Sequence, residues 1–383
     1  DYFYYSMPPY YHKHCHNVKY AEAFKKCPDI HIPVTTVGSI TSMEEAEKII
    51  ASGKADIVAM ARPLMAGPDL IKNAYAGKEE KTRPCLRCFE CAPNVMQHLH
   101  CAVNPVCGRE TQYRILPPIE EKKKVVVIGG GVAGMQAVQT LTKRGHEVVL
   151  FEKEKELGKR LYEISNLSFK DDMRRYWDWA VRTTKATNAK IYLGTEATPE
   201  LVMAEQPEAI FIATGSLPIV PPIPGIEKTH TILDVDNGRV EVGETVVVCG
   251  GGLSGCECAL ELAYQGKKVT IVDMIPVAAF AKDASPSPYT MLHALLKKNG
   301  VKMVGESKVQ RFTEEGVEVI DKNWNTTLLK ADTMVNALGM KPDKKTADQF
   351  AGLVPEVYLI GDASKVSNIR HATNSAFIYA VEC

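Results

Sequence analysis

A glycine-rich pattern that occurs twice in the chain constrains its fold more than any other feature. The first copy is Gly129-Gly130-Gly131-Val132-Ala133-Gly134, and it follows the apolar run 125–128 directly. A helix-forming stretch, 135–144, comes next, and a second apolar run, 148–151, ends in Glu152. Strand, glycine turn, helix, strand and acid in this order predict a Rossmann-type βαβ unit that binds a dinucleotide.

Three glycines of this pattern each have a physical task. Gly129 makes the tight turn, Gly131 lets a pyrophosphate approach the backbone, and Gly134 allows the helix to pack closely on the strand. Glu152 lies 18 residues after Gly134, where an acidic side chain accepts hydrogen bonds from ribose hydroxyls.

The second copy repeats the whole arrangement about 120 residues later, which indicates an internal duplication. Strand 245–249 leads into Gly250-Gly251-Gly252-Leu253-Ser254-Gly255, followed by helix 253–265 and strand 269–272, which ends in Asp273. Two such sites imply two different dinucleotides, one bound tightly and one exchanging. Asp273 at the ribose position repels a 2′-phosphate, and Met274 and Ile275 supply no arginine, so NADH is favoured over NADPH.

Further strand ends complete the two units. Strand 209–213 closes on Ala213-Thr214-Gly215, and the prolines at 218, 221, 222 and 224 then predict a connection between subdomains. Strand 333–337 runs into Leu338-Gly339-Met340, and strand 357–360 into Gly361-Asp362, with a helix starting near Asn368. At the latter strand end the glycine permits backbone contact with a cofactor and the carboxylate accepts a ribityl hydroxyl; a plain Gly-Asp turn is the alternative.

Four cysteines stand in a C-x2-C-x2-C-x9-C pattern between Pro84 and Pro105. They are Cys85, Cys88, Cys91 and Cys101. Three thiolates two residues apart can hold one corner of an inorganic cluster, and a fourth after a short loop closes the coordination. A structural zinc ion is the alternative, although zinc sites usually pair two C-x2-C knuckles farther apart. The spacing favours iron–sulfur.

The first 80 residues predict two βα repeats and hence a parallel sheet. Strand 32–37 precedes Gly38-Ser39 and helix 43–52, which Thr41 or Ser42 can cap; strand 55–61 precedes Arg62-Pro63 and a helix around 69–76. On a (β/α)8 barrel, the loops after the last two strands commonly bind a phosphate. Gly38 and Arg62 suit that role, but a turn glycine and a surface ion pair explain them equally well.

Before these repeats lies a loop, 1–17, rich in tyrosine and histidine, including His12, His14, Cys15 and His16. Adjacent residues rarely converge on one metal ion, so a metal site is the less favoured interpretation. An aromatic loop at the mouth of a barrel, touching substrate or flavin, is the favoured one.

Composition excludes several classes of partner. The 383 residues carry 46 basic and 46 acidic side chains, which gives no electrostatic footprint for nucleic acid or an anionic membrane. No apolar run approaches the roughly 18 residues of a membrane span, and no signal peptide is visible. Eleven cysteines, four of them in the cluster pattern, predict a reducing cytoplasm. We expect a homo-oligomer.

Together these motifs resemble the multidomain relatives of old yellow enzyme. That group includes 2,4-dienoyl-CoA reductases, clostridial enoate reductases and bile-acid-pathway flavin oxidoreductases, with trimethylamine dehydrogenase as a more distant relative. The resemblance covers nearly the whole chain and includes Cys101-Ala102-Val103-Asn104-Pro105 and Glu257 in the second glycine unit. The cysteine spacing departs from dienoyl-CoA reductases, which have one more residue between the second and third cysteine, whereas the amine dehydrogenases share the C-x2-C-x2-C start.

The resemblance implies an α/β fold with the C-terminal end of a TIM barrel, an iron–sulfur linker and two Rossmann-like domains. The expected divisions are a barrel end at 1–80, a cluster-binding linker at 81–118, an FAD domain at 119–225 and 346–383, and an NAD(H) domain at 226–345. The implied FMN residues are Gly38, Ser39, Ala61 and Arg62. The implied FAD residues are Gly129, Gly131, Gly134, Glu152, Thr214, Gly215, Gly361 and Asp362. The implied NAD residues are Gly250, Gly252, Gly255, Glu257, Asp273 and Gly339, and the four cysteines would ligate a 4Fe-4S cluster.

The resemblance also implies an electron relay from NADH through FAD and the 4Fe-4S cluster to FMN. The final acceptor would be the activated C=C bond of an enoate, an enoyl-CoA or a steroid-type enone. The active-site Tyr and His of the family would lie before Asp1, so the chain offers no catalytic residue for that step. An amine dehydrogenase and an electron-supplying diaphorase module are the alternatives.

Overall fold

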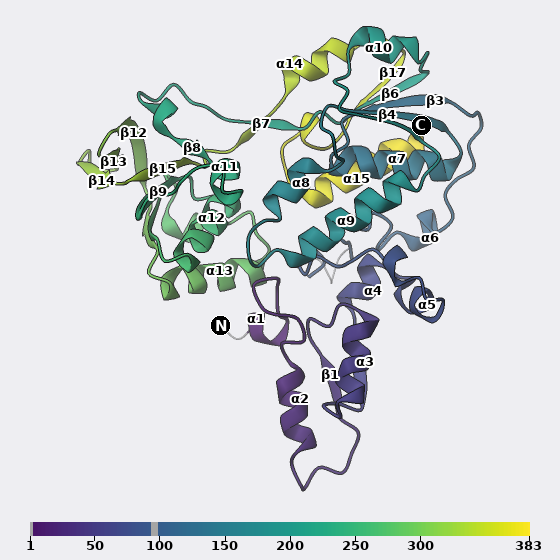
Figure 1. Cartoon of the computed structure of the whole chain (residues 1–383), viewed down its shortest axis with the longest axis horizontal. Coiled ribbons are helices and arrows are strands. Elements are labelled where there is room, and N and C mark those ends of the chain that lie inside the picture. Colours follow the sequence, from purple (N-terminus) through teal and green to yellow (C-terminus); the bar gives the residue numbers. More distant parts are fainter. Residues whose placement is uncertain (1–2, 93–98) are drawn as a thin grey trace. The chain divides into compact units, whose positions relative to one another are not determined.

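The computed structural model describes residues 3–92 and 99–383 (Figure 1). Its backbone divides into two compact units. The larger unit comprises the described residues up to 162 together with 172–217 and 341–383, and the smaller unit comprises 163–171 and 218–340. Both are described separately below.

A five-stranded parallel sheet forms the core of the larger unit, with the strand order β17-β6-β3-β4-β5. Its strands are β3 (Lys124–Ile128), β4 (Glu147–Glu152), β5 (Lys190–Leu193), β6 (Ala209–Ile212) and β17 (Glu356–Leu359). Val125, Val126 and Val127 are fully buried, because a central parallel strand is covered on both faces. The β-branched runs seen in the sequence therefore form the middle of the sheet.

Helices cover this sheet. They are α7 (Val132–Arg144), α8 (Lys159–Ile164), α9 (Asp171–Lys185), α10 (Pro199–Ala204) and α15 (Ile369–Glu382). Helices α7 and α15 lie side by side (Figure 1). Helix α7 ends at Gly145, whose φ of 107° places it in the left-handed conformation that commonly terminates helices. The Asn368 side chain caps α15 by accepting a hydrogen bond from the His371 N–H.

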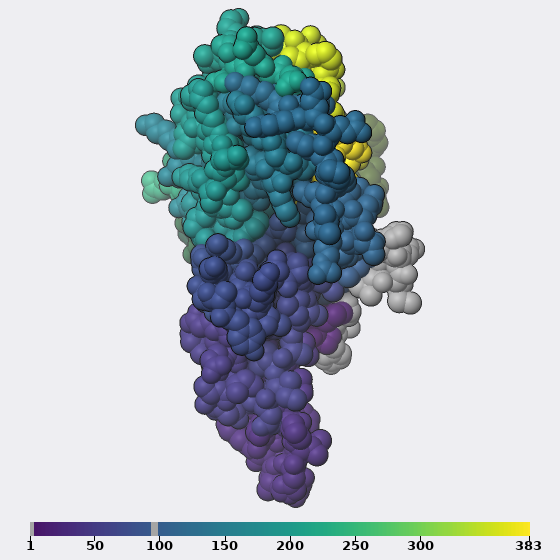
Figure 2. Space-filling view, turned by 90° about the vertical axis from the view of Figure 1, so that its right-hand side faces the viewer, coloured from purple at the N-terminus to yellow at the C-terminus, as the bar shows by residue number. Residues whose placement is uncertain are grey.

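The N-terminal part of the same unit contains a parallel pair of strands, β1 (Thr35–Val37) and β2 (Ile57–Ala59). Around them lie α1 (Phe3–Ser6), α2 (Val18–Lys25), α3 (Met43–Ala51), α4 (Arg62–Ala66) and α5 (Leu70–Tyr75). A capping box between Ser42 and Glu45 starts α3. Figure 2 shows this purple part continuing into the blue segment around residues 81–118. The short helix η1 (Glu79–Lys81) precedes that segment, and its described residues include the short helix α6 (Glu110–Tyr113).

The smaller unit repeats the Rossmann architecture with a second parallel sheet, ordered β11-β10-β9-β15-β8. Its strands are β8 (His230–Thr231), β9 (Thr245–Cys249), β10 (Lys268–Val272), β11 (Lys302–Val304) and β15 (Thr333–Asn336), and its helices are α11 (Ile232–Asp236), α12 (Leu253–Tyr264) and α13 (Pro286–Lys298). An antiparallel sheet of β12 (Ser307–Thr313), β13 (Gly316–Asp321) and β14 (Thr326–Lys330) packs its apolar residues with those of β9 and β10. Strand β7 (Ser216–Pro218) pairs with β16 (Met340–Pro342) where the chain passes between the units.

The strands and helices predicted around both glycine patterns are confirmed, within one to three residues at their ends. The prediction missed α4, which begins at Arg62 although Pro63 follows, because proline is well tolerated in the first helical turn. It also missed α9, an amphipathic helix without a preceding motif. The finer division into four domains stays a prediction.

Candidate functional site

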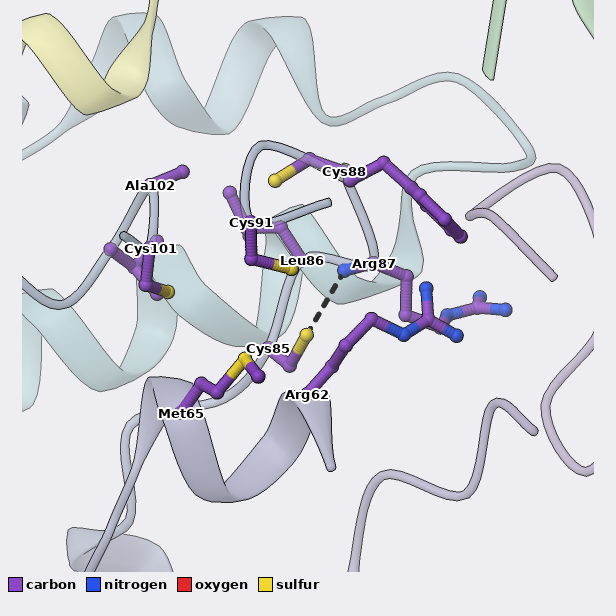
Figure 3. A pocket seen from close by; sticks show the side chains of 11 residues that line it. Arg62, Met65, Cys85, Leu86, Arg87, Cys88, Cys91, Cys101 and Ala102 are labelled. Atoms are coloured by element: carbon purple, nitrogen blue, oxygen red, sulfur yellow. Dashed lines mark hydrogen bonds between the residues drawn. The ribbon is translucent and has the colours of Figure 1, made fainter. Parts of the chain in front are cut away.

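The four predicted cysteines line one pocket of the larger unit (Figure 3). Cys85, Cys88 and Cys91 lie on the irregular segment after η1, and Cys101 approaches from the chain beyond it. Their sulfur atoms face a shared space. The loop 93–98 between the third and fourth cysteine lies outside the described residues. Within the described part of the chain, no three His, Cys, Asp or Glu side chains converge closely enough to hold a single metal ion.

Two residues between the cysteines have an unusual backbone conformation. Arg87 and Phe89 have φ values of 52° and 67°, in the left-handed region that non-glycine residues seldom adopt. The Arg87 N–H donates a hydrogen bond to the Cys85 Sγ at 3.3 Å. Such conformations persist only where surrounding contacts determine them, and they concentrate at ligand sites.

Burial raises the pKa of all four thiols. The pKa of Cys85 rises to about 12 despite the opposing charge of Arg62. Burial likewise raises the pKa of Cys88, Cys91 and Cys101. Thiols in this environment stay protonated until a metal displaces the protons, so the donor set suits a metal centre whose own charge stabilises thiolates.

Arg62, predicted to bind a phosphate, lies on the wall of the cysteine pocket. Its guanidinium stacks over the Phe89 ring at 4.7 Å from the ring centroid, and Nη2 donates to the Pro8 carbonyl at 3.0 Å. Nη1 is buried and has no hydrogen-bond partner in the described structure. A buried cationic donor without a partner fits an anion or a metal cluster.

The other predicted FMN residues lie near the same carbonyl. Ser39 is buried and donates its hydroxyl proton to the Pro8 carbonyl at 2.9 Å. Gly38 has a φ of 124°, and a Cβ there would lie 2.4 Å from the Asn17 amide nitrogen. Ala61 is the residue that precedes α4. The structure brings this set together, and its role in binding FMN stays a prediction.

A buried ion-pair network, which the sequence analysis missed, supports the cysteine segment. Arg87 Nε donates to Asp172 Oδ2 at 2.5 Å, and the two side chains are only 4% and 1% exposed. His14 bridges the other Asp172 oxygen, at 2.9 Å, to Glu45, at 2.5 Å. Burial lowers the pKa of His14, but the hydrogen bonds to Asp172 and Glu45 outweigh it and raise the pKa to about 9. The only signal in the sequence was a lone arginine between two cysteines.

The rest of the aromatic N-terminal loop packs on itself. The rings of His12 and His16 lie 3.9 Å apart between centroids, and the Tyr5 ring lies 5.5 Å from that of His12. Arg87 Nη1 also donates to the His12 carbonyl at 2.7 Å. Contact of this loop with flavin or substrate stays a prediction.

The first glycine pattern has the expected geometry. Gly129 has a φ of 100°, and a Cβ there would lie 2.4 Å from the Ala213 carbonyl oxygen; one on Gly134 would lie 1.8 Å from the Gly129 oxygen. Nothing lies within 4 Å of a Cβ on Gly131, so the backbone is open where a pyrophosphate would approach. Glu152 accepts hydrogen bonds from the N–H groups of Gly130, at 2.6 Å, and Glu154, at 2.8 Å.

Two further strand ends meet this pattern. The Thr214 hydroxyl is buried without a hydrogen-bond partner among the described residues, and the position beside Gly215 is open. Asp362 accepts from the Ser216 hydroxyl at 3.0 Å. A Cβ on Gly361 would lie 2.8 Å from the Cβ of Ala133 in the first glycine pattern. The buried, unpaired hydroxyl and the open backbone positions fit a bound dinucleotide.

Helix α15 connects the Gly361-Asp362 strand end to the cysteine segment. The Thr373 hydroxyl donates to the Ala102 carbonyl at 2.8 Å, next to Cys101. Arg370 donates to His100 Nε2 at 2.5 Å and pairs with Glu90 at 3.4 Å. Arg109 donates to the Asn374 side chain. Helix α15 therefore contacts the cysteine segment and follows the predicted flavin-binding turn.

The second glycine pattern, in the smaller unit, has matching geometry. A Cβ on Gly250 would lie 2.1 Å from the Ala337 oxygen, one on Gly255 would lie 2.2 Å from the Gly250 oxygen, and Gly252 is open. Asp273 accepts from the N–H groups of Gly251, at 2.6 Å, and Ile275, at 3.2 Å. Glu152 in the first glycine unit and Asp273 in the second therefore occupy equivalent positions.

Two other predicted NAD residues lie in the same unit. Glu257, on α12, is 1% exposed and forms an ion pair with Lys170 at 2.6 Å. Gly339 has a φ of 100°, and its carbonyl accepts from the Ile219 N–H at 2.9 Å. In the described ranges, 3–92 and 99–383, no helix combines the length and apolarity needed to cross a membrane.

Comparison with known proteins identifies the two parts. The pyridine nucleotide-disulphide oxidoreductase family matches residues 123–376, and the NADH:flavin oxidoreductase / NADH oxidase family matches residues 9–81. A cinnamate reductase of Clostridium sporogenes is 37% identical over 381 residues, which cover 98% of this chain and 57% of that protein. An NADH oxidase of Thermoanaerobacter brockii is 39% identical over 372 residues, which cover 93% of this chain and 56% of that protein. A solved 2-naphthoyl-CoA reductase complex matches with a TM-score of 0.91 at 27% identity, over 98% of this chain and 57% of that one.

The chain spans a little more than half the length of the curated relatives it matches. The family matches confirm the expected fold class and the binding of flavin and a pyridine nucleotide. Residues 9–81 thus represent part of a flavin-binding TIM barrel, and the duplicated glycine units are the nucleotide-binding domains. The chain therefore belongs to the multidomain flavin oxidoreductases related to old yellow enzyme.

Proposed function

We propose that this chain carries the iron–sulfur and dinucleotide-binding machinery of an NADH-dependent ene reductase. The substrate would be a small molecule with an activated alkene, such as an enoate, an enoyl-CoA or a steroid-type enone. Cinnamate reductase and 2-naphthoyl-CoA reductase, both similar to this chain, bear names of reactions in this class. Location in the cytoplasm and assembly into a homo-oligomer stay predictions.

The observation that carries the proposal is the single pocket lined by Cys85, Cys88, Cys91 and Cys101. Four thiols around a shared space suit a 4Fe-4S cluster, whose irons are each held by one cysteine thiolate. Arg62, with its unpaired Nη1, would offset the negative charge of the ligated cluster. The Arg87 amide would donate to a coordinating sulfur, and such hydrogen bonds raise the reduction potential of iron–sulfur centres.

The predicted FAD, NADH and FMN residues would bind and orient the organic cofactors. Bound cofactors supply hydride transfer at the flavins and one-electron transfer at the cluster. We assign the FAD site to the first glycine pattern with Glu152, Thr214, Gly215, Gly361 and Asp362, and the NADH site to the second with Asp273. The open backbone at Gly131 and Gly252 would accept the two pyrophosphates. Gly38, Ser39, Ala61 and Arg62 would border FMN.

The amine dehydrogenase alternative is less well supported. An enzyme that passes electrons outward to another protein needs no exchanging dinucleotide, so its second nucleotide site is free to degenerate. Here the second glycine pattern retains the close glycine contacts at Gly250 and Gly255 and the acid Asp273.

An anaerobic assay separates the two functions. The full-length protein, which includes the substrate-binding part of the barrel, is mixed with NADH and either cinnamate or a tertiary amine. NADH oxidation and organic products are both measured. The proposal predicts alkene reduction that depends on NADH. Amine oxidation without NADH consumption would instead establish the alternative.

A further inference from the structure

The N-terminus of α12 in the smaller unit is capped by an acidic side chain from a neighbouring loop. Asp283 Oδ1 accepts a hydrogen bond from the Leu253 N–H at 3.1 Å. Leu253 is the first residue of this 12-residue helix and follows Gly252 directly. Helix N-termini bind anions, and in a Rossmann unit this one receives the pyrophosphate. Asp283 thus places a carboxylate where the proposed NADH site requires a phosphate.

The duplicated first half shows how this loop is built. In the first half, the Gly158 N–H donates to the Gly130 carbonyl at 2.9 Å; in the second, the Ala281 N–H donates to the Gly251 carbonyl at 2.7 Å. Gly158 and Ala281 both have left-handed backbones, with φ values of 67° and 52°. The two residues are therefore structural equivalents.

Hydrophobic contacts support this equivalence. The side chain of Leu157, just before Gly158, lies against Gly130, where an added Cβ would meet it at 2.5 Å. The ring of Phe280, just before Ala281, lies against Gly251, where the corresponding distance is 2.7 Å. Two residues after each equivalent position stand Arg160 in the first half and Asp283 in the second. The charge at this position of the loop sequence is thus reversed between the two halves.

We propose that Asp283 is an internal competitor for the pyrophosphate of NADH and weakens its binding. The carboxylate satisfies the α12 N-terminus while the site is empty, and an arriving dinucleotide must displace it. Because Asp283 is exposed, it can turn into solvent at little structural cost. This arrangement suits a nucleotide that is bound and released in every turnover, and the cation in the first half suits one that is retained. The inference rests on the proposed NADH site.

Equilibrium binding to the fully reduced protein, kept anaerobic so that the flavin cannot accept hydride from NADH, tests the proposal without catalysis. Dissociation constants for NADH, ADP and adenosine are measured by calorimetry for the parent and for Asp283→Asn, Asp283→Ala and Asp283→Arg. An anion at an exposed helix N-terminus changes an equilibrium by about two- to fivefold, so Asn and Ala should tighten binding of NADH and ADP by that factor. Asp283→Arg, which copies the first half, should tighten it further. Adenosine, which has no phosphate, should bind equally to all.

Glu241→Gln is the matched control. Glu241 is an exposed acid of the same unit, near the amino end of β9, whereas the glycine pattern follows the carboxyl end of that strand. Glu241→Gln changes the net charge by one, as Asp283→Asn and Asp283→Ala do, and should leave all three affinities unchanged. Unchanged NADH and ADP affinities in the three Asp283 variants would overturn the inference alone. A parent protein that binds neither NADH nor ADP would overturn the NADH site itself, and the inference with it.

Discussion

Replacing Asp172 by asparagine should destabilise the larger unit strongly. Asp172 is 1% exposed and accepts hydrogen bonds from Arg87, at 2.5 Å, and His14, at 2.9 Å. Hydrogen bonds to charged groups contribute about 1.5–3 kcal/mol each, so two amount to about 3–6 kcal/mol. Removing one partner of a buried ion pair costs about 3–5 kcal/mol, which agrees with this sum of the two hydrogen bonds. Because Arg87 keeps its bond to the His12 carbonyl, we expect a loss near 3 kcal/mol.

Urea unfolding followed by tryptophan fluorescence measures this loss. Trp179 lies buried on α9, the helix of Asp172, and its indole N–H donates to the Lys81 carbonyl at 3.0 Å. Asp171→Asn is the control, because Asp171 is exposed and the chemical change is identical. It should alter the free energy of unfolding by less than about 0.5 kcal/mol. If Asp172→Asn costs no more than Asp171→Asn, the network does not hold the cysteine segment in place.

Three other changes test separate parts of the site. Cys88→Ser should abolish bound iron and sulfide while FAD remains, as measured by iron analysis and flavin absorbance; zinc in anaerobically purified parent protein would contradict this. Asp273→Ala should narrow the preference for NADH over NADPH by about 1–3 kcal/mol, measured as the ratio of their dissociation constants. Equal affinities of the parent for NADH and NADPH would contradict the role of Asp273. The pKa of His14 is raised to about 9. Protonated His14 therefore stabilises the fold fully below pH 6.5, and this contribution is lost as the pH rises through 9. Between these pH values, the free energy of unfolding from urea titrations should fall by about 1–2 kcal/mol more in the parent than in His14→Gln. Equal decreases would refute the raised pKa of His14.

The glycine units were predictable because local sequence determines them. Gly129, Gly134, Gly250 and Gly255 each lie where a side chain would collide with a backbone oxygen. Such a position restricts the residue type, and its spacing from neighbouring strands is fixed by the βαβ unit. The pattern could therefore be read without knowledge of distant contacts.

The ion-pair network was not predictable, because its members come from separate parts of the chain. Asp172 lies 85 residues from Arg87 and 158 from His14. Nothing in the composition near Asp172 distinguishes it from the exposed Asp171. Arg62 illustrates the same limit: its phosphate-binding motif was visible, but its place beside Cys85 and Phe89 depends on the tertiary fold.

The central claim is that the cysteine pocket holds a cluster in electronic contact with the NADH-dependent flavin. Helix α15, which follows Gly361-Asp362 and contacts Ala102 beside Cys101, is the structural basis for this claim. The most direct measurement is anaerobic titration of the purified protein with NADH, followed by low-temperature electron paramagnetic resonance and flavin absorbance. We predict that NADH bleaches the flavin and produces the signal of a reduced 4Fe-4S cluster, and that Cys91→Ser shows the bleaching without that signal. A cluster that dithionite reduces but NADH leaves oxidised, while the flavin bleaches fully, would contradict the account.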